Sequence, residues 1–397
     1  MLTSLALIFL VGLLFGVLFE RLRLPPLLGM IVTGMMLGPH ALNLLDSSIL
    51  NISAELRQLA LVIILTRAGL SLDMADLKRV GRPAILMCFL PACFEIVGVL
   101  LIAPKLLGIT MLQAAIMGSV IAAVSPAVIV PRMLVIMEAG YGKKHSIPQL
   151  ILAGASVDDV FVIVLFTAFV SLAAGGHISA VGFAEIPLSI ALGILAGGGC
   201  VLLLALFFKR FSMRASIKVL ILLSISFLLL ECQNRLQGVV PLSGLLAIMS
   251  VGITLYQKCP EFAEKLASKY NKLWVGAQIL LFVLVGATVD LSYVRAQGLA
   301  AAAIVLGALL FRMAGVWTCL IKTALSLREK LFCLLAYTPK ATVQAAIGAI
   351  PLSMGLAGGQ QVLTVAVLSI LITAPFGAMA VDRLYKRLHR QDGDADA

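Results

Sequence analysis

Three carboxylic acids interrupt stretches of sequence that are otherwise apolar. Glu95 lies in PACFEIVGVL, and the adjacent Asp158 and Asp159 lie in LAGASVDDVFVIVLF. A carboxylate inside a bilayer is costly, so such acids usually face a partner charge or a water-filled path. Adjacent helical residues point about 100° apart. We therefore expect one of the two aspartates to bind an ion and the other to serve a neighbouring helix or the water path.

Oxygen ligands suit a hard monovalent cation such as Na⁺ or Li⁺. Hydroxyl groups of Ser125, Ser156 and Thr342 could supplement the carboxylates of Asp158 and Asp159. Desolvation favours the neutral form of a carboxyl group, so one group could hold either a proton or the cation. This competition is the simplest chemistry of antiport.

Two basic residues, Arg312 and Lys340, also fall within apolar stretches. Three acids and two bases leave one net negative charge, which one monovalent cation or proton would neutralise. Because unpaired buried charge is expensive, we expect pairing. Arg312 stays protonated, and we prefer a Glu95–Arg312 strut. Lys340 could itself release a proton when desolvated.

Prolines predict that two apolar segments hold broken helices. Pro126 and Pro131 lie in AAVSPAVIVPRM, and Pro339 lies in AYTPKATVQ. Proline removes a backbone donor and clashes with the preceding turn. Irregular backbone at membrane depth is tolerated only where protein buries it or it lines a cavity. We expect the two broken helices to cross at the membrane centre, where freed carbonyls could coordinate a cation.

The whole chain has the composition of an all-α polytopic membrane protein. Of its 397 residues, 61% are hydrophobic and 12% are charged, with a mean hydropathy of +1.10. Soluble domains carry about twice that charged fraction. Apolar runs of spanning length predict about thirteen transmembrane helices, near 2–19, 24–40, 50–70, 83–106, 111–137, 148–173, 187–208, 216–233, 240–257, 273–291, 298–321, 331–352 and 362–381.

The net charge of +11 does not indicate nucleic-acid binding. Lys and Arg gather in alternate loops, as the positive-inside rule describes. This pattern places the N-terminus outside and the C-terminus, with a short tail over 382–397, in the cytoplasm; we expect a bacterial inner membrane. The seven cysteines show no metal-binding spacing. We expect no cofactor and no enzymatic activity.

The first half of the sequence recurs weakly in the second. RAGLSLD and LVGATVDL both read G-x-[S/T]-x-D, with Gly69 and Gly286 separated by 217 positions. The same offset carries Glu95 onto Arg312, and an offset of 213 carries Pro126 onto Pro339. An odd number of spans separates the motifs, which indicates inverted repeats. We expect 50–173 to form the first repeat, with the ion-binding core, and 273–381 to form the second repeat. Residues 187–257, together with the N-terminal helices, are expected to link the repeats or to lie on the dimerisation side. Asp73, Asp76 and Asp290 are expected to be helix caps or gate contacts.

Four segments resemble those of the monovalent cation:proton antiporter-2 superfamily, related to NhaA and NapA and most similar to its NHA-type Na⁺/H⁺ exchangers. They are TRAGLSLD, AAVSPAVIVPRML, GYGKKHSIPQLILAGASVDDV and AYTPKATVQAAIG. The resemblance implies a homodimer, a dimerisation domain, a six-helix core that moves as an elevator, and a role in pH homeostasis. It also implies that Asp159 is the principal ion-binding group, with Asp158 beside it. Arg312 replaces the lysine of NapA-type members, which leaves the stoichiometry open.

The same buried residues leave one alternative function open and disfavour three others. K⁺/H⁺ exchange needs only a different cavity size, which sequence does not reveal. A cation channel is disfavoured by buried Lys340 and Arg312, and organic-anion transport is disfavoured by buried acids. An intramembrane aspartyl protease needs two aspartates that converge on one water, and adjacent positions on one helix do not converge.

Overall fold

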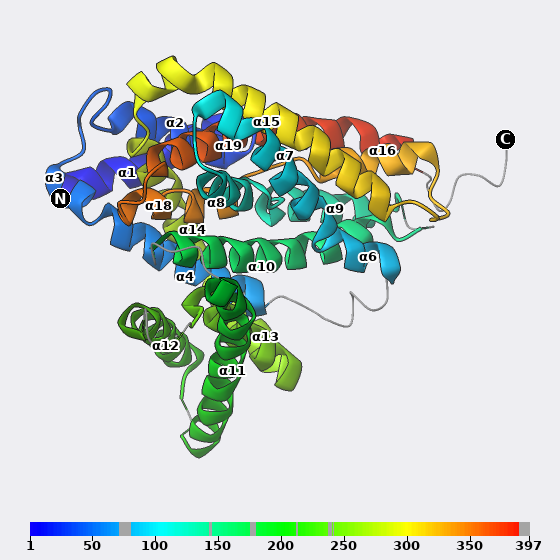
Figure 1. The fold of residues 1–397 in the computed structure, drawn as a ribbon. Coiled ribbons are helices and arrows are strands. Elements are labelled where there is room, and N and C mark those ends of the chain that lie inside the picture. Colours follow the sequence, from blue (N-terminus) through cyan, green and yellow to red (C-terminus); the bar gives the residue numbers. More distant parts are fainter. Residues whose placement is uncertain are drawn as a thin grey trace. The chain divides into compact units, whose positions relative to one another are not determined.

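The computed structural model of the chain describes residues 1–70, 81–142, 145–174, 180–211, 213–236, 240 and 242–388. These residues form helices and their connections, without a strand (Figure 1). Each predicted apolar segment overlaps a helix, which confirms the all-α class. Within the described ranges, nine helices are long and apolar enough to cross a membrane, and Pro26–Leu37 and Thr342–Ser353 are shorter apolar helices. The number thirteen stays a prediction.

The chain divides into two compact units. The first unit draws on Met1–Ala54, Met74–Val162 and Phe282–Ala397. Its helices are α1 (Leu2–Arg21), α2 (Pro26–Leu37), α3 (Ser47–Asn51), α6 (Arg82–Met87), α7 (Leu90–Leu107), α8 (Met111–Ile121), α9 (Pro126–Glu138), the first part of α10 (Ile147–Ala174), the end of α14 (Pro260–Ala287), α15 (Leu291–Cys319), α16 (Leu327–Ala336), α17 (Thr342–Ile347), α18 (Ile350–Ser353) and α19 (Gly359–Leu384). Helices α7 and α15 pack along each other, and α19 packs against α8, α15 and α16.

The second unit draws on Glu55–Asp73 and Ile163–Leu281. It contains most of α4 (Ser53–Leu70), the rest of α10 and α14, and α11 (Ala180–Arg210), α12 (Ala215–Leu236) and α13 (Gly244–Lys258). Within it α13 packs against both α11 and α12. The predicted repeat and dimerisation parts, 50–173, 273–381 and 187–257, stay predictions.

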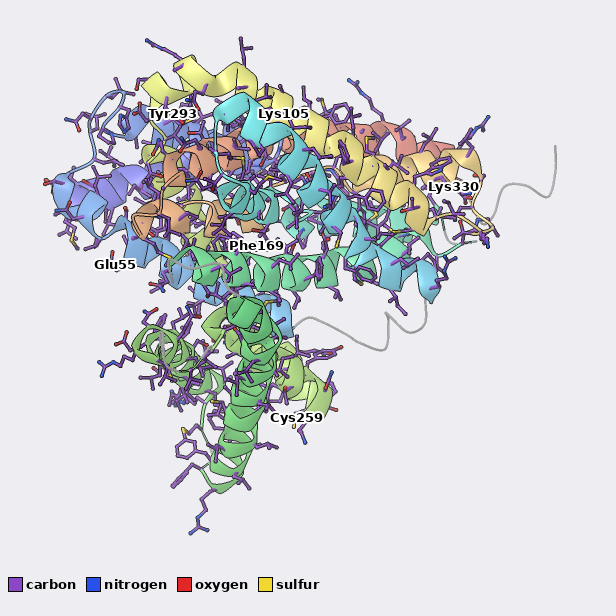
Figure 2. The ribbon with its side chains drawn as sticks, viewed as in Figure 1. Glu55, Lys105, Phe169, Cys259, Tyr293 and Lys330 are labelled. Carbon is purple, nitrogen blue, oxygen red and sulfur yellow. The ribbon has the colours of Figure 1, made fainter. Side chains whose placement is uncertain are left out.

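Local sequence sets the ends of the helices in the first unit. Asp290 is the N-cap of α15, and its carboxylate accepts hydrogen bonds from the backbone N–H groups of Ser292 and Tyr293. This confirms Asp290 as a cap; Asp73 and Asp76 lie outside the described residues. Lys330 of α16 is labelled in Figure 2. At the other end of α15, its ammonium lies 5.7 Å from the centre of the Trp317 ring. This contact joins the two helices across their turn.

Two helices are interrupted, as the prolines predict. Helix α8 ends at Ile121 and α9 begins at Pro126; α16 ends at Ala336 and α17 begins at Thr342, with Pro339 in the gap. Pro126 occupies the first helical position, where a missing N–H costs nothing. The expectation of a break at Pro131 is wrong, because α9 continues through it. A single lost backbone bond is tolerated in a membrane helix whose neighbours satisfy the freed group.

Close contacts between glycines follow the internal repeat. A Cβ on Gly69 would lie 2.4 Å from the Met249 carbonyl oxygen, with the Gly252 Cα at 3.1 Å. A Cβ on Gly286 would lie 2.2 Å from the Ile31 carbonyl oxygen, with the Gly34 Cα at 3.1 Å. The first contact joins α4 to α13 and the second joins α14 to α2. Gly34 and Gly252 differ by 218 positions, close to the offset of 217 between Gly69 and Gly286. The same helix-to-helix approach is therefore made twice.

Candidate ion-binding site

The two interrupted helices meet in the first unit. The backbone N–H of Ser125 donates to the carbonyl of Pro339 at 2.8 Å, which joins the gap before α9 to the gap before α17. The Ser125 hydroxyl lies 3.4 Å from the Thr342 hydroxyl. The two interrupted helices therefore contact each other directly, through backbone and side chains.

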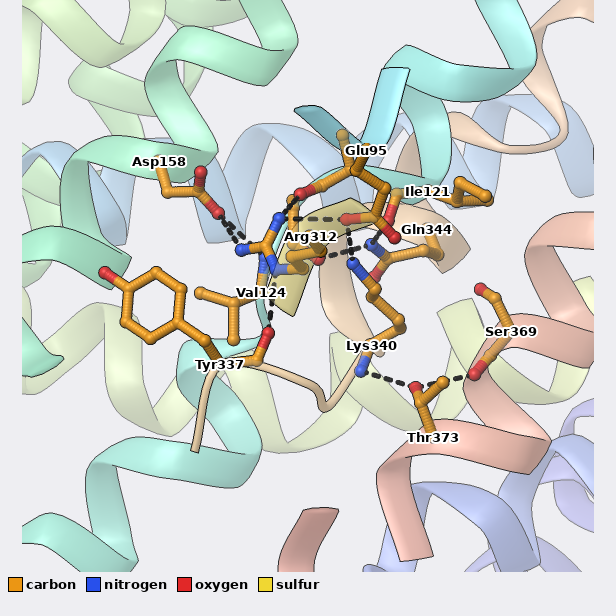
Figure 3. A network of polar contacts seen from close by, with 12 residues as sticks. Glu95, Ile121, Val124, Asp158, Arg312, Tyr337, Lys340, Gln344, Ser369 and Thr373 are labelled. Atoms are coloured by element: carbon orange, nitrogen blue, oxygen red, sulfur yellow. Dashed lines mark hydrogen bonds and ion pairs between the residues drawn. The ribbon is translucent and has the colours of Figure 1, made fainter. Parts of the chain in front are cut away.

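Arg312 is the centre of the polar network around this crossing (Figure 3). It is fully buried on α15. Its Nη1 donates to Glu95 Oε2 at 3.0 Å and to the Ala122 carbonyl, and its Nη2 donates to Asp158 Oδ2 at 2.8 Å. Its Nε donates to the Tyr337 carbonyl at 2.7 Å. One guanidinium therefore ties both gaps to α7 and α10.

Lys340 forms the second buried ion pair. Its Nζ lies 2.6 Å from Glu95 Oε2, the same oxygen that Arg312 contacts. Both side chains are 1% exposed. The sequence-predicted pair of Glu95 and Arg312 is present, and Lys340 makes it a triad. Two cations on one carboxylate leave a positive charge that the Asp158–Arg312 contact compensates.

The two adjacent aspartates have different surroundings. Asp158 Oδ2 accepts from Arg312 and from the backbone N–H of Val124 at 2.9 Å. Asp159 is 8% exposed, and Oδ1 of both aspartates is buried without a hydrogen-bond partner among the described residues, so the difference lies in the contacts of Asp158 Oδ2. One acid is held by the protein framework and the neighbouring acid is not, as the 100° separation of adjacent helical residues suggests.

The other candidate ligands lie at the crossing or outside the described side chains. Ser125 and Thr342 are buried and paired with each other. No hydrogen bond joins either hydroxyl to Asp159 in the part of the chain that the structure describes. Ser156 lies on α10, and its side chain is outside the described residues.

Several carbonyls of the two gaps are already hydrogen-bonded within the protein. The Arg312 guanidinium donates to the carbonyls of Ala122 and Tyr337. The Gln344 side chain donates to the Ala123 carbonyl. The Ser125 backbone N–H donates to the Pro339 carbonyl. Protein donors therefore satisfy much of the backbone that the proline breaks set free.

Three contributors to this network were missed in the sequence. Gln344 donates to the gap before α9 from the first turn of α17. Thr373 on α19 accepts from the Lys340 backbone N–H at 2.9 Å. Tyr337 places its ring 5.4 Å from the Arg312 guanidinium carbon. A glutamine three residues after a helix start is a capping signal that could have been noticed, whereas threonine and tyrosine in apolar segments are too common to signal a role.

Comparison with known proteins places this geometry in a family. Residues 5–386 match the family profile described as "Sodium/hydrogen exchanger, transmembrane". The chain is 31% identical over 395 residues to the sodium/hydrogen exchanger 9B2 of Mus musculus, covering 95% of this chain and 71% of that one. It is 32% identical over 374 residues to the human sodium/hydrogen exchanger 9B1, covering 90% and 71%.

The fold is shared with a solved archaeal structure. The sodium proton antiporter MjNhaP1 from Methanocaldococcus jannaschii superposes with a TM-score of 0.81, covering 97% of this chain and 98% of that chain at 19% identity. At that identity the likeness concerns the fold alone. The extent of the family match, together with relatives above 30% identity over nearly the full chain, settles the assignment. This integral membrane chain belongs to the sodium/hydrogen exchanger family.

Proposed function

We propose that the chain is a secondary active antiporter that exchanges Na⁺ or Li⁺ for H⁺ by alternating access, with Asp159 holding the proton and the cation in turn. Membership of the sodium/hydrogen exchanger family supports cation/proton exchange. The relatives carry that name, and the fold resembles that of a sodium proton antiporter. Interrupted helices that cross inside a membrane protein are a recurring frame for ion sites.

The observation that carries the assignment of Asp159 is the charge balance of the network. Glu95 and Asp158 are matched by Arg312 and Lys340 through direct contacts. Asp159 adds a further carboxyl group whose Oδ1 is buried and has no partner among the described residues. An uncompensated buried carboxylate is expensive, so the group binds either a proton or a cation. Exchange between these two states is antiport.

The hydroxyls of Ser125, Thr342 and Ser156, with Asp158 beside Asp159, are the proposed further oxygen ligands of the cation. Ligands from both interrupted helices would make the site sensitive to their relative movement, which alternating access requires. We also propose a homodimer in a cell membrane, with the N-terminus outside and the C-terminus in the cytoplasm. The orientation rests on the distribution of Lys and Arg between loops.

The test is ion flux in liposomes that contain the purified protein and a pH-sensitive dye. Asp159→Asn should abolish proton movement driven by a Na⁺ or Li⁺ gradient. Asp46→Asn is the control, because Asp46 caps α3 through Ser48 and asparagine caps equally well. Wild-type flux in Asp159→Asn would reject the assignment of the site. A parallel series with Na⁺, Li⁺ and K⁺ decides the cargo, and flux with K⁺ alone would establish K⁺/H⁺ exchange instead.

A further inference from the structure

Gln344 connects the two interrupted helices through its side-chain amide. It lies in the first turn of α17 and is 1% exposed. Its Oε1 accepts from the backbone N–H of Ala341 at 2.8 Å, as a helix cap does. Its Nε2 donates to the carbonyl of Ala123 at 2.8 Å, in the gap before α9. One amide therefore satisfies a donor of one gap and an acceptor of the other.

The carbonyl that Gln344 holds belongs to the same peptide unit as the N–H that holds Asp158. The C=O of Ala123 and the N–H of Val124 lie in one rigid plane. Gln344 binds the carbonyl end, and Asp158 Oδ2 accepts from the N–H end at 2.9 Å. Turning this plane would break both hydrogen bonds. A donor on the carbonyl also polarises the N–H and strengthens its bond to the carboxylate.

The second gap repeats this arrangement with different partners. The Pro339 carbonyl accepts from the Ser125 N–H, and the Lys340 N–H of the same peptide unit donates to Thr373 at 2.9 Å. Both planes are thus held at two ends, and the two N–H groups donate to side chains of the long helices α10 and α19. Only the first plane ends on a carboxylate, and only there is the carbonyl held by a side chain that can be replaced.

We propose that Gln344 is a positioning residue of the exchanger, which orients the Ala123–Val124 peptide so that Asp158 stays on Arg312 and Asp159 alone exchanges. This inference rests on the proposed role of Asp159. Without the amide, the peptide can turn and Asp158 loses its backbone donor. Asp158 is then held by Arg312 alone and can turn toward Asp159, so the cation no longer meets one fixed and one exchanging carboxylate. Sodium ions bind this altered set of ligands less tightly.

The test uses an isosteric replacement that keeps the cap. In Gln344→Glu the carboxylate still accepts from the Ala341 N–H, because glutamate is favoured at this position of a capping box. The donor to Ala123 is lost. Gln344→Met, of similar length and uncharged, separates this loss from the effect of an added charge. Gln113→Glu is the matched control, since Gln113 caps Thr110 at 2.8 Å in the first turn of α8, at the end remote from the gap.

We expect Gln344→Glu and Gln344→Met to raise the Na⁺ concentration for half-maximal exchange about tenfold near neutral pH, as loss of one hydrogen bond implies. Maximal turnover should be retained. Hydrogen–deuterium exchange of the Val124 amide in detergent should also accelerate. Gln113→Glu should match the wild type in all three measurements.

A lower unfolding temperature with unchanged half-maximal concentration and unchanged Val124 exchange would make Gln344 purely structural and overturn the inference. If the liposome variants are inactive, the Val124 amide decides: unchanged exchange there rejects the positioning role. Failure of the proposed function looks different, because it appears as full activity in Asp159→Asn whatever Gln344 does.

Discussion

Arg312 Nη2 lies 2.8 Å from Asp158 Oδ2, and both side chains are fully buried. The same carboxylate oxygen accepts from the Val124 N–H. Asp158 is therefore part of the frame that joins α10, α15 and the gap before α9. Oδ1 of both aspartates is buried without a partner among the described residues, so the ion pair through Oδ2 is what sets Asp158 apart from Asp159. The two aspartates should respond differently to the same substitution.

Asp158→Asn should lower stability and spare exchange. Asparagine can still accept from Val124, but Arg312 loses the charge that faces it, and leaving one partner of a buried ion pair costs about 3–5 kcal/mol. We expect a lower unfolding temperature in detergent and residual cation-driven proton flux. Asp159→Asn should show the reverse, with flux lost and stability equal to or above that of the wild type. Identical profiles for the two variants would contradict the division of roles.

Replacement of Arg312 should affect Asp158 more than Glu95. Lys340 Nζ remains 2.6 Å from Glu95, whereas Asp158 keeps only a backbone donor. We expect Arg312→Met to destabilise the protein by about 3–5 kcal/mol. Addition of Asp158→Asn should recover part of that loss, and addition of Glu95→Gln should recover less, because it strands Lys340. Additive losses in this double-mutant cycle would show that Arg312 and Asp158 are not coupled.

The balanced network predicts one-for-one exchange that is insensitive to voltage. Under the proposed role Asp159 alone changes its occupant, so one proton would replace one monovalent cation and no net charge would cross. A charge that crosses the full membrane contributes about 2.3 kcal/mol per 100 mV. Liposomes clamped at different potentials with valinomycin and K⁺ should give equal Na⁺/H⁺ exchange rates. Rates that follow the potential would mean that a second group, with Lys340 the first candidate, also gives up a proton.

Gly154 allows Tyr337 to approach α10 one turn before Asp158. A Cβ on Gly154 would lie 2.0 Å from the Tyr337 hydroxyl oxygen, and the Tyr337 carbonyl and ring both contact Arg312. We expect Gly154→Ala to displace Tyr337 and to destabilise the protein by about 1–3 kcal/mol. Tyr337→Phe removes the clashing atom, so the double variant should recover most of the unfolding temperature. No recovery would place the strain at Met87, whose Cβ is next nearest at 3.0 Å.

Charge and proline made much of this arrangement predictable. Glu95 and Arg312 stand out because buried charge is rare in apolar sequence and must be paired. Pro126 and Pro339 mark both gaps because a proline cannot donate a backbone bond. The helix boundaries were harder to predict. Helix α14 begins at Pro260, well before the predicted 273. Hydropathy detects only the apolar part of a helix that continues through polar sequence.

The choice of partners could not be predicted from sequence. Whether Arg312 contacts Asp158 or Asp159 depends on a rotation of about 100° around α10, which no residue type reveals. Pro131 is the converse case: the residue type predicts a break in the helix, but α9 continues through it. The role of Gln344 could not be predicted, because a glutamine can equally be a helix cap, a surface residue or a bridge between segments. Only the folded structure shows that the two gaps lie close enough for its amide to connect them.

Glu329 gives the fold a defined response to acid. Its carboxylate is 1% exposed at the start of α16 and contacts His145 Nδ1 at 2.9 Å, and it caps the Ser326 N–H at 2.8 Å. Burial would raise the pKa of Glu329, but hydrogen bonds from His145 and Ser326 outweigh it and hold the pKa below its ordinary value of 4.5. A lowered pKa in the folded state means that the stabilisation is complete above about pH 4.5 and is lost as pH falls through the folded-state pKa.

Glu329→Gln should therefore unfold at a lower temperature than the wild type at pH 6–7, by the equivalent of about 1.5–3 kcal/mol for a hydrogen bond to a charged group. The two proteins should converge as pH falls from 4.5 through the lowered folded-state pKa of Glu329, since protonation removes from the wild type what the substitution removes from the variant. Scanning fluorimetry in detergent from pH 3.5 to 7.5 measures this difference, with Glu264→Gln on an exposed face of α14 as the control. A gap between Glu329→Gln and the wild type that stays constant down to pH 3.5 would show that the contact with His145 does not depend on the charge of Glu329.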